Sequence, residues 1–319
     1  MSEESGSRWL RLGVPALGGL ALLGGLTWWL SGEACRLVLG GHRGPVWAVA
    51  FSADGTRLAT GGDGVRLWHL PNGGRLGTID VAGKNVQALA FSPDGTLLSC
   101  GGADGILRLF DVNSQVERFQ TSAHRGGVHA VAFTPDGKTL VSGGADKLIR
   151  LWDVASTRQR DVLRGHTGTV LALALSADGQ TLASAGNDQT VRLWDLASRK
   201  SRVLRGHRQR VTALAFGGGQ LASGDREGHL RLWDISGREL IERTAHDDRI
   251  VGLGWAGGRL VTAAENGELA LWPAPTTSSD VQRWRQRRLS NAAAVAPDGS
   301  SVSTAGSDGR TRLWDLPPS

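Results

Sequence analysis

Histidine, serine and aspartate recur together along this 319-residue chain. Two of the sets are His124, Ser142 and Asp146, and His166, Ser184 and Asp188. These residue types form the triad of serine hydrolases, in which an aspartate orients the histidine that activates the serine. A triad, however, works as one exposed copy beside an oxyanion hole, whereas these sets recur at regular intervals. We therefore expect these sets to have a structural role, and we expect no catalytic residues and no enzyme activity.

The elements that carry these residues repeat with a period near 40. Each of seven apolar runs ends in an aromatic residue at a spacing of 42, 42, 42, 39, 39 and 42 residues, namely Trp68, Phe110, Trp152, Trp194, Trp233, Trp272 and Trp314. Leu-Trp-Asp occurs at 151–153, 193–195, 232–234 and 313–315, and Gly-His or Ala-His pairs follow in register, for example at 165–166 and 206–207. Such a period indicates a repeat architecture.

These motifs resemble the WD-repeat family over residues 36–319. The resemblance implies an all-β protein, a seven-bladed β-propeller whose four-stranded antiparallel sheets surround a channel. It also implies that histidine, serine or threonine, aspartate and tryptophan form a buried network in each blade. The residues assigned to it are His124, Ser142, Asp146, Trp152, His166, Ser184, Asp188, Trp194, His207, Ser223 and Trp233.

The network is uneven from unit to unit. Unit five has Glu227 at the aspartate position and unit six has Asn266, while Asp63 is the nearest acid in unit one. Unit two departs most, since Ala82, Cys100 and Phe110 replace three members and only Asp104 remains. Unit seven has Gln286 at the histidine register beside Thr304, Asp308 and Trp314. We expect units three and four to be the most rigid.

Local chemistry supports the same architecture. In unit three, strands are predicted at 128–133, 138–143, 148–154 and 159–164. The Thr-Pro-Asp-Gly segment at 134–137 predicts a hairpin turn, because proline presets φ, aspartate bonds the nearby backbone and glycine accepts positive φ. The last unit ends at its third strand, 311–316. Its fourth strand is predicted at 35–39, so the two termini complete one blade and cover both sheet edges.

Residues 12–30, which follow an N-terminal tail at 1–11, contain no charge and precede a propeller at 35–319. As a helix they would span roughly 28 Å, close to the thickness of a bilayer core. Trp9 lies before this segment and Trp28 and Trp29 near its end, as in an interfacial belt. We expect a single-pass membrane anchor; a cleaved signal peptide and a buried soluble element are the alternatives. Two arginines lie on each side of this segment, so the distribution of positive charge does not predict its orientation. Because a short tail precedes the segment and a large domain follows it, we expect the propeller to lie outside the cytoplasm.

Composition excludes several classes of site. Two cysteines, Cys35 and Cys100, make no disulfide framework, and the chain has no zinc-type Cys/His spacing. The glycine-rich stretches at 40–42 and 217–219 are turns by register, so we expect no phosphate loop, cofactor, metal or small-molecule substrate. The net charge of +6, almost entirely due to arginine, favours acidic partners or anionic lipids. Nucleic acid is not favoured, since only Trp284 interleaves the basic run at 283–288.

In the WD-repeat family, partners contact the loops before the first and after the second strand of each blade. The residues matching these loops or lying beside them are Arg43, Trp47, Lys84, Arg125, His129, Arg208, Arg210, Asp247 and Arg249. Arginine and tryptophan are common interface anchors, although a solvated rim would explain any single one equally well. The sequence therefore predicts a membrane-tethered, non-catalytic scaffold for proteins. The alternative is a secreted or channel-acting propeller, a ligand binder or hydrolase released by signal-peptide cleavage.

Overall fold

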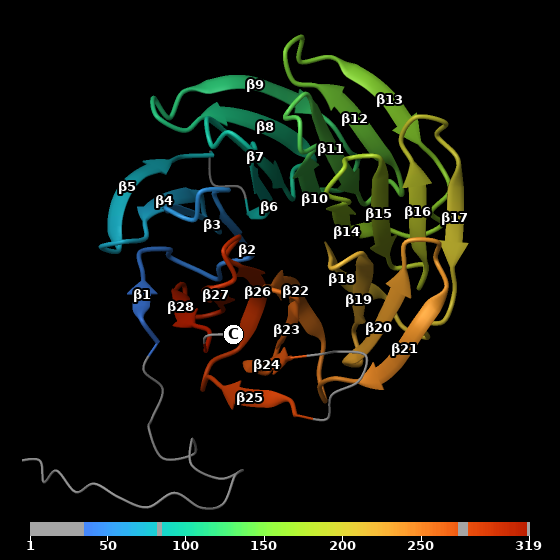
Figure 1. Ribbon diagram of the computed structural model, residues 1–319. Helices are drawn as coiled ribbons and strands as arrows, with labels where there is room; N and C mark the ends of the chain where they lie inside the picture. Colours follow the sequence, from blue (N-terminus) through green and yellow to red (C-terminus); the bar gives the residue numbers. More distant parts are fainter. Residues whose placement is uncertain (1–34, 82–84, 274–279, 318–319) are drawn as a thin grey trace, which may run out of the picture. The chain divides into compact units, whose positions relative to one another are not determined.

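The computed structural model describes residues 35–81, 85–273 and 280–317. Within them, every regular element is a β-strand, and the strands form seven four-stranded antiparallel sheets around a central axis (Figure 1). The all-β class and the seven-bladed β-propeller are therefore confirmed. Residues Cys35–Ser319 form one compact unit.

Blades one to six are meanders in which four consecutive strands lie side by side from the axis to the rim (Figure 1). Blade one consists of β2 (Ala48–Phe51), β3 (Arg57–Gly61), β4 (Val65–His69) and β5 (Gly74–Ile79). Blade two consists of β6 (Val86–Phe91), β7 (Leu97–Gly102), β8 (Ile106–Asp111) and β9 (Glu117–Ser122). Blade three consists of β10 (Val128–Phe133), β11 (Thr139–Gly144), β12 (Ile149–Asp153) and β13 (Gln159–Leu163). The predicted strands of this blade are confirmed to within one residue at each end.

The remaining blades repeat the pattern. Blade four consists of β14 (Val170–Leu175), β15 (Thr181–Gly186), β16 (Val191–Asp195) and β17 (Ser201–Leu204). Blade five consists of β18 (Val211–Gly217), β19 (Gln220–Asp225), β20 (His229–Asp234) and β21 (Glu239–Thr244). Blade six consists of β22 (Ile250–Ala256), β23 (Arg259–Ala264), β24 (Glu268–Trp272) and β25 (Gln282–Arg285). Blade seven consists of β26 (Ser290–Val295), β27 (Ser301–Gly306), β28 (Thr311–Asp315) and β1 (Leu37–Leu39).

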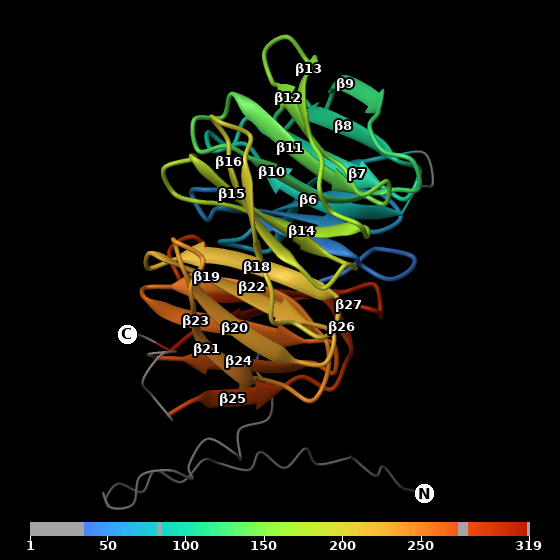
Figure 2. The ribbon, with the colours of Figure 1, turned by 90° about the vertical axis from the view of Figure 1, so that its right-hand side faces the viewer.

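Neighbouring blades pack face to face, as the side view shows (Figure 2). The tryptophan of one blade packs against the strands of the blade before it: Trp194 lies in one apolar cluster with Ile149 and Leu151 of blade three. Because both faces of the middle strands are covered, their residues are buried on both faces rather than at every second position, and β11 is buried along its whole length. The core is therefore distributed between the blades.

The inner hairpin turns form as their residue types predict. In blade three, Asp136 Oδ1 accepts hydrogen bonds from Thr134 Oγ1 at 2.6 Å and from the Lys138 N–H at 3.0 Å. Gly137 has a φ of 69°, which only glycine adopts without strain. These contacts stabilise the first hairpin through hydrogen bonds between residues of the turn itself.

The propeller closes by pairing its two ends. Strand β1 pairs antiparallel with β28, with Leu37 opposite Leu313 and Leu39 opposite Thr311. Leu39 is 3% exposed and shares a cluster with Leu58 and Trp68 of blade one. The predicted closure is confirmed, with a strand two residues shorter than the predicted 35–39.

The predicted tail at 1–11 and the predicted membrane helix at 12–30 lie outside the described residues. Over 35–81, 85–273 and 280–317, no helix has the length and apolar character needed to cross a membrane.

Candidate functional site

A histidine-centred network links the strands of blades three, four and five. In blade four, His166 Nδ1 lies 2.8 Å from Asp188 Oδ2, and its Nε2 lies 2.7 Å from Ser184 Oγ. Trp194 Nε1 donates a 2.7 Å hydrogen bond to the same Ser184 Oγ. The corresponding contacts in blade three measure 2.7, 2.8 and 2.9 Å among His124, Asp146, Ser142 and Trp152. Each network joins the loop before the first strand to the second and third strands.

The order aspartate, histidine, serine is that of a hydrolase triad, but the serines cannot meet a substrate. Ser142, Ser184 and Ser223 are each 0% exposed, and each hydroxyl contacts both a histidine and a tryptophan. A nucleophile needs room for a carbonyl carbon beside its oxygen and donors for the developing oxyanion. These groups therefore act in packing: a fully satisfied polar network specifies one arrangement of the core.

The network holds its aspartates ionised. Burial by itself raises the pKa of Asp188, but hydrogen bonds from His166 and from the Thr167 N–H outweigh it, so the net pKa lies well below the usual range. Burial lowers the pKa of His124, against the opposing hydrogen bond to Asp146. The neutral histidine beside a carboxylate is thus the state that the fold stabilises.

Blade five corrects one assignment made from the sequence. His207 Nδ1 lies 2.8 Å from Asp225 Oδ2, whereas Glu227, which occupies the aspartate register, is exposed and accepts a 2.7 Å hydrogen bond from Gln209 Nε2. Asp225 is 1% exposed and also accepts bonds from the Glu227 and His229 N–H groups. It ends β19, so its carboxylate reaches the histidine from the strand instead of the turn.

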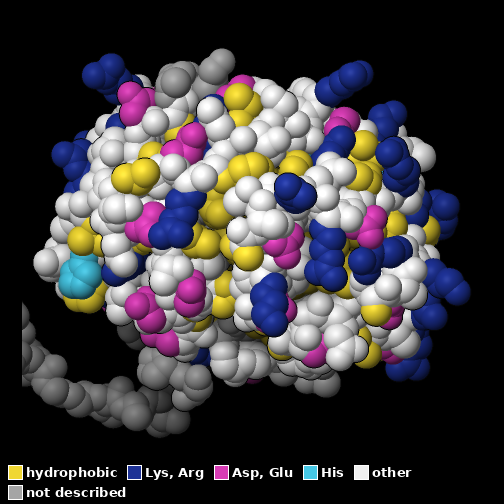
Figure 3. Space-filling view, turned by 90° about the horizontal axis from the view of Figure 1, so that it is seen from above, with side chains coloured by type: hydrophobic (Ala, Val, Ile, Leu, Met, Phe, Trp, Pro, Cys, Tyr) yellow, Lys and Arg dark blue, Asp and Glu magenta, His cyan; other side chains and the backbone are white. Residues whose placement is uncertain are grey.

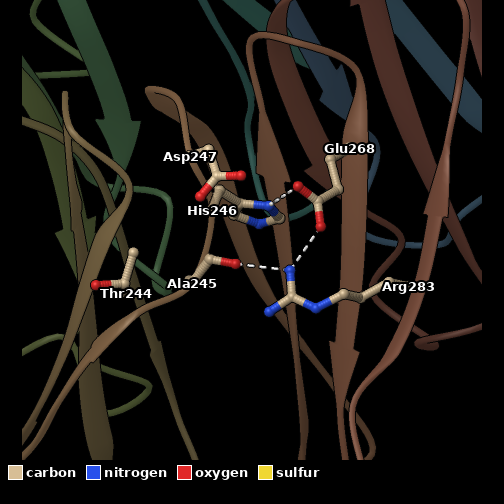
Figure 4. Close-up of a pocket in the computed structure, with 6 residues that line it drawn as sticks. All are labelled: Thr244, Ala245, His246, Asp247, Glu268 and Arg283. Atoms are coloured by element: carbon tan, nitrogen blue, oxygen red, sulfur yellow. Dashed lines mark hydrogen bonds and ion pairs between the residues drawn. The ribbon is translucent and has the colours of Figure 1, made fainter.

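Blade six uses a glutamate in the same role (Figure 4). His246 Nδ1 lies 3.2 Å from Glu268 Oε2, while the side-chain oxygen of Asn266 accepts the Glu268 N–H within the turn. Arg283 on β25 donates to Glu268 Oε1 at 2.6 Å and to the Ala245 carbonyl at 2.7 Å. These groups line a surface cleft of about 250 Å³, but the His246 side chain is itself 0% exposed. Of the groups that line the cleft, His246 and Arg283 are both paired with Glu268.

Blades one, two and seven vary the network further. In blade one, His42 bonds Asp63 at 2.7 Å and Thr60 at 2.9 Å. In blade seven, Thr304 donates to Gln286 Oε1 at 3.2 Å. Blade two has no counterpart at Cys100, where burial raises the pKa of the thiol to about 12, so this cysteine is an inert core residue.

The loop face is defined here as the end of the propeller that carries the loops before each first strand and after each second strand. Of the residues predicted to bind partners there, Arg43, Arg125, Arg208 and Asp247 are exposed. Trp47 is 40% exposed, His129, Arg210 and Arg249 are half-buried, and Lys84 lies outside the described residues. Burial lowers the pKa of His129.

The central channel opens on this face. A cavity of about 230 Å³ is lined by the innermost strands of all seven blades, and its residues include Trp47, Gln87, His129, Leu171, Thr212 and Val251. All but Trp47 stand at a break in the register with the second strand, between the paired residues on either side. Such bulges re-aim a side chain. In blades two to six, the residue at this bulge therefore lines the channel, and its type differs from blade to blade.

Positive charge also collects on the outer strands. Figure 3 shows Lys and Arg side chains gathered towards one side of the rim. Lys200, Arg202 and Arg205, on and beside β17, are exposed, whereas Arg199 is paired with Asp161. Across the residues that the structure describes, no cluster of three or more His, Cys, Asp or Glu side chains could hold a metal ion.

The chain belongs to the WD-repeat family. The family profile for the WD domain, G-beta repeat, matches residues 33–69, 73–111, 115–153, 157–195, 198–234 and 289–315. Residues 235–288, which include all four strands of blade six, have no match, although these strands form the same four-stranded sheet. Among curated proteins, none matches the chain significantly. Membership in this family suggests a protein-interaction scaffold.

Proposed function

We propose that this protein is a non-catalytic scaffold that binds partner proteins through its loop face. The observation that carries the proposal is the contrast between two sets of polar residues. The histidine, serine and aspartate sets are buried and internally satisfied, as in blade four. The exposed side chains of the loop face surround a channel mouth that holds Trp47, a type of residue that often anchors interfaces.

Partner capture with a paired set of variants tests this function. The variant Trp47→Glu/Arg125→Glu changes the loop face, and Val116→Glu/Arg158→Glu makes the same change in charge at exposed positions on turns between third and fourth strands. With tagged protein in its native source, we expect the loop-face variant to lose partners by at least about tenfold, as for an interface anchor. Equal capture by both variants would overturn the proposal.

We also propose that residues 12–30 tether the propeller to a membrane, with the propeller outside the cytoplasm. The support is in the sequence: an uncharged run of bilayer length with tryptophans near its end. Fractionation with protease treatment of intact cells tests it. A C-terminal tag should stay in the salt-washed membrane pellet and be digested from outside; release of the tag into the soluble fraction would contradict the tether.

The alternative is a secreted propeller, freed by cleavage of the same segment. The mass of the mature N-terminus separates the two, since cleavage removes the apolar run and an anchor retains it.

A further inference from the structure

Every blade but the first carries a corresponding pair of residues at the edge of the loop face. One precedes the first strand, the other follows the second strand, and the N–H of the second donates to the carbonyl of the first. The pairs are Asn85 with Ala103, Gly127 with Ala145, Thr169 with Asn187, Arg210 with Arg226, Arg249 with Glu265, and Leu289 with Ser307. Charged side chains occupy these positions only in blades five and six. Because all six pairs make the same backbone hydrogen bond, blades five and six differ from the others here only in their side chains.

The charges at these two pairs do not balance. Arg249 Nε lies 3.0 Å from Glu265 Oε2, so these two opposite charges form an ion pair. The positive charges of Arg210 and Arg226 are then in excess. Among the described residues, neither has a carboxylate within ion-pair distance, and the buried Nε of Arg210 has no hydrogen-bond partner. The nearby Glu227 carboxylate is bonded to Gln209 instead.

The three guanidinium groups act on one another. The pKa of Arg210 is lowered by burial and by the positive charges of Arg226 and Arg249, with Glu265 opposing. Like charges held together in a partly desolvated place destabilise the free protein and are relieved when an anion binds. A guanidinium also matches the geometry of a carboxylate, with two parallel hydrogen bonds.

We propose that Arg210 and Arg226, assisted by Arg249, bind the carboxylates of a short acidic segment of a partner protein. This inference rests on the proposed scaffold function and names the chemistry of the partner at one part of the loop face. Arg210 precedes β18 and Arg226 follows β19, so the two residues lie side by side at the open end of this hairpin. Two neighbouring acidic side chains therefore suffice to neutralise them.

The surroundings favour a peptide over a polyanion. Thr212 and Val251, each two residues beyond one of the arginines, line the neutral channel mouth. An apolar side chain flanking the acidic segment fits that mouth. Asp247 and Asp248 lie on the same loop as Arg249, and with Glu265 they disfavour a longer row of phosphates.

Fluorescence anisotropy tests the assignment with labelled peptides that alternate short runs of glutamate with leucine. A glutamine–leucine peptide, a phosphoserine–leucine peptide and a single-stranded oligonucleotide serve as comparison probes. The variants are Arg210→Gln/Arg226→Gln and a rim control, Arg158→Gln/Arg160→Gln, which removes the same charge from exposed positions in blade three. Thermal unfolding checks that both variants fold.

We expect the full-length protein to bind the glutamate peptide in preference to all three comparison probes. Removing Arg210 and Arg226 should weaken binding by about tenfold or more, while the rim control stays within about twofold. In the wild-type protein, the arginine Nε–H NMR signals that disappear in the double variant should shift on titration. The inference is overturned if wild type does not bind the glutamate peptide, if both variants weaken equally, or if the phosphoserine peptide or the oligonucleotide binds more tightly.

The outcome is separable from the scaffold proposal. A partner that is captured by the wild type and by Arg210→Gln/Arg226→Gln, but lost from Trp47→Glu/Arg125→Glu, would leave the scaffold function intact and exclude this acidic-segment site.

Discussion

At the residue scale, a carboxylate beside a buried histidine recurs in blades one, three, four, five and six. Where the histidine, serine and tryptophan are all present, one hydroxyl receives the indole N–H and contacts the imidazole, as Ser184 does. Removing one member leaves a polar atom of its neighbour buried without a hydrogen bond, which costs more than the bond itself contributes. The residue types of a hydrolase triad therefore act here in the packing of the blades.

Blade five offers a matched test of that cost. We expect Asp225→Ala to lower the free energy of unfolding by about 1–3 kcal/mol, because it leaves His207 Nδ1 and two backbone N–H groups unpaired. Glu227→Ala, two residues away and exposed, should change it by less than about 0.5 kcal/mol. Urea unfolding measures both, and equal losses would contradict the assignment of Asp225 to the network.

The buried histidines also predict how stability depends on pH. Burial is the main cause that lowers the pKa of His42, His124 and His246 from 6.5. Below pH 6.5 the unfolded chain therefore binds more protons than the fold, so stability is full above that pH and declines as the pH falls towards the folded values. Aspartates such as Asp188, whose pKa is lowered from 3.8, add a second loss as the pH falls below 3.8.

Unfolding free energies measured from pH 8 to 3 should show both stages, a decline below about pH 6.5 and a steeper one below about pH 4. The variant His124→Gln, which imitates Gln286 of blade seven, should flatten part of the first stage. Stability that rises on acidification through pH 6 would contradict the buried neutral state.

At the scale of the element, the blades have the same backbone arrangement but differ in the side-chain hydrogen bonds that join their loops to their strands. Blades three and four have the full network, whereas blade two has Cys100 and Phe110 in place of the hydroxyl and indole. Its strands are still packed, since Leu98 and Cys100 are at most 1% exposed. Blade two therefore lacks the contacts among histidine, hydroxyl and indole, although Arg108 still pairs with Asp104 at 2.9 Å.

Native-state amide exchange should rank the blades accordingly. We expect the slowest exchange in β11, β12, β15 and β16, and faster exchange in β7 and β8, because fewer interactions oppose local opening there. Exchange that is slowest in blade two would contradict a rigidifying role for the network.

At the scale of the whole molecule, stability depends on closing the ring. Strand β1 supplies the outer strand of blade seven, and its Leu39 packs against blade one. This short segment thereby joins the first blade to the last, and its loss exposes β28 as an open edge.

Leu39 and Val38 both pair with β28, but only the Leu39 side chain is buried, so substitutions at these two positions measure the contribution of side-chain packing to the closure. Leu39→Ala should destabilise the propeller by about 2–5 kcal/mol, the usual cost of truncating a buried leucine. Val38→Ala, at a side chain that is 48% exposed, should cost less than about 0.5 kcal/mol. Thermal unfolding measures both, and a Leu39 variant as stable as wild type would show that closure does not contribute to stability.

The sequence by itself determined the number of blades, the strand ends and the closure, because each depends on local signals. Turn residues such as Asp136 and Gly137, and apolar runs ending in an aromatic, act within a few residues of one another. The pattern persists where the first hairpins of blades five and six are shorter and the spacing of the aromatic residues falls from 42 to 39. The register of the last unit also indicated that its fourth strand lies at the other terminus.

Only the tertiary structure decided which side chains meet. Glu227 occupies the right register yet points away from His207, while Asp225 and, in blade six, Glu268 reach their histidines from different backbone positions. Arg226, absent from the predicted binding residues, is joined to Arg210 by a backbone hydrogen bond across the hairpin. Spacing along a chain constrains where a backbone runs, but the reach and direction of each side chain depend on strands that meet only in the folded propeller.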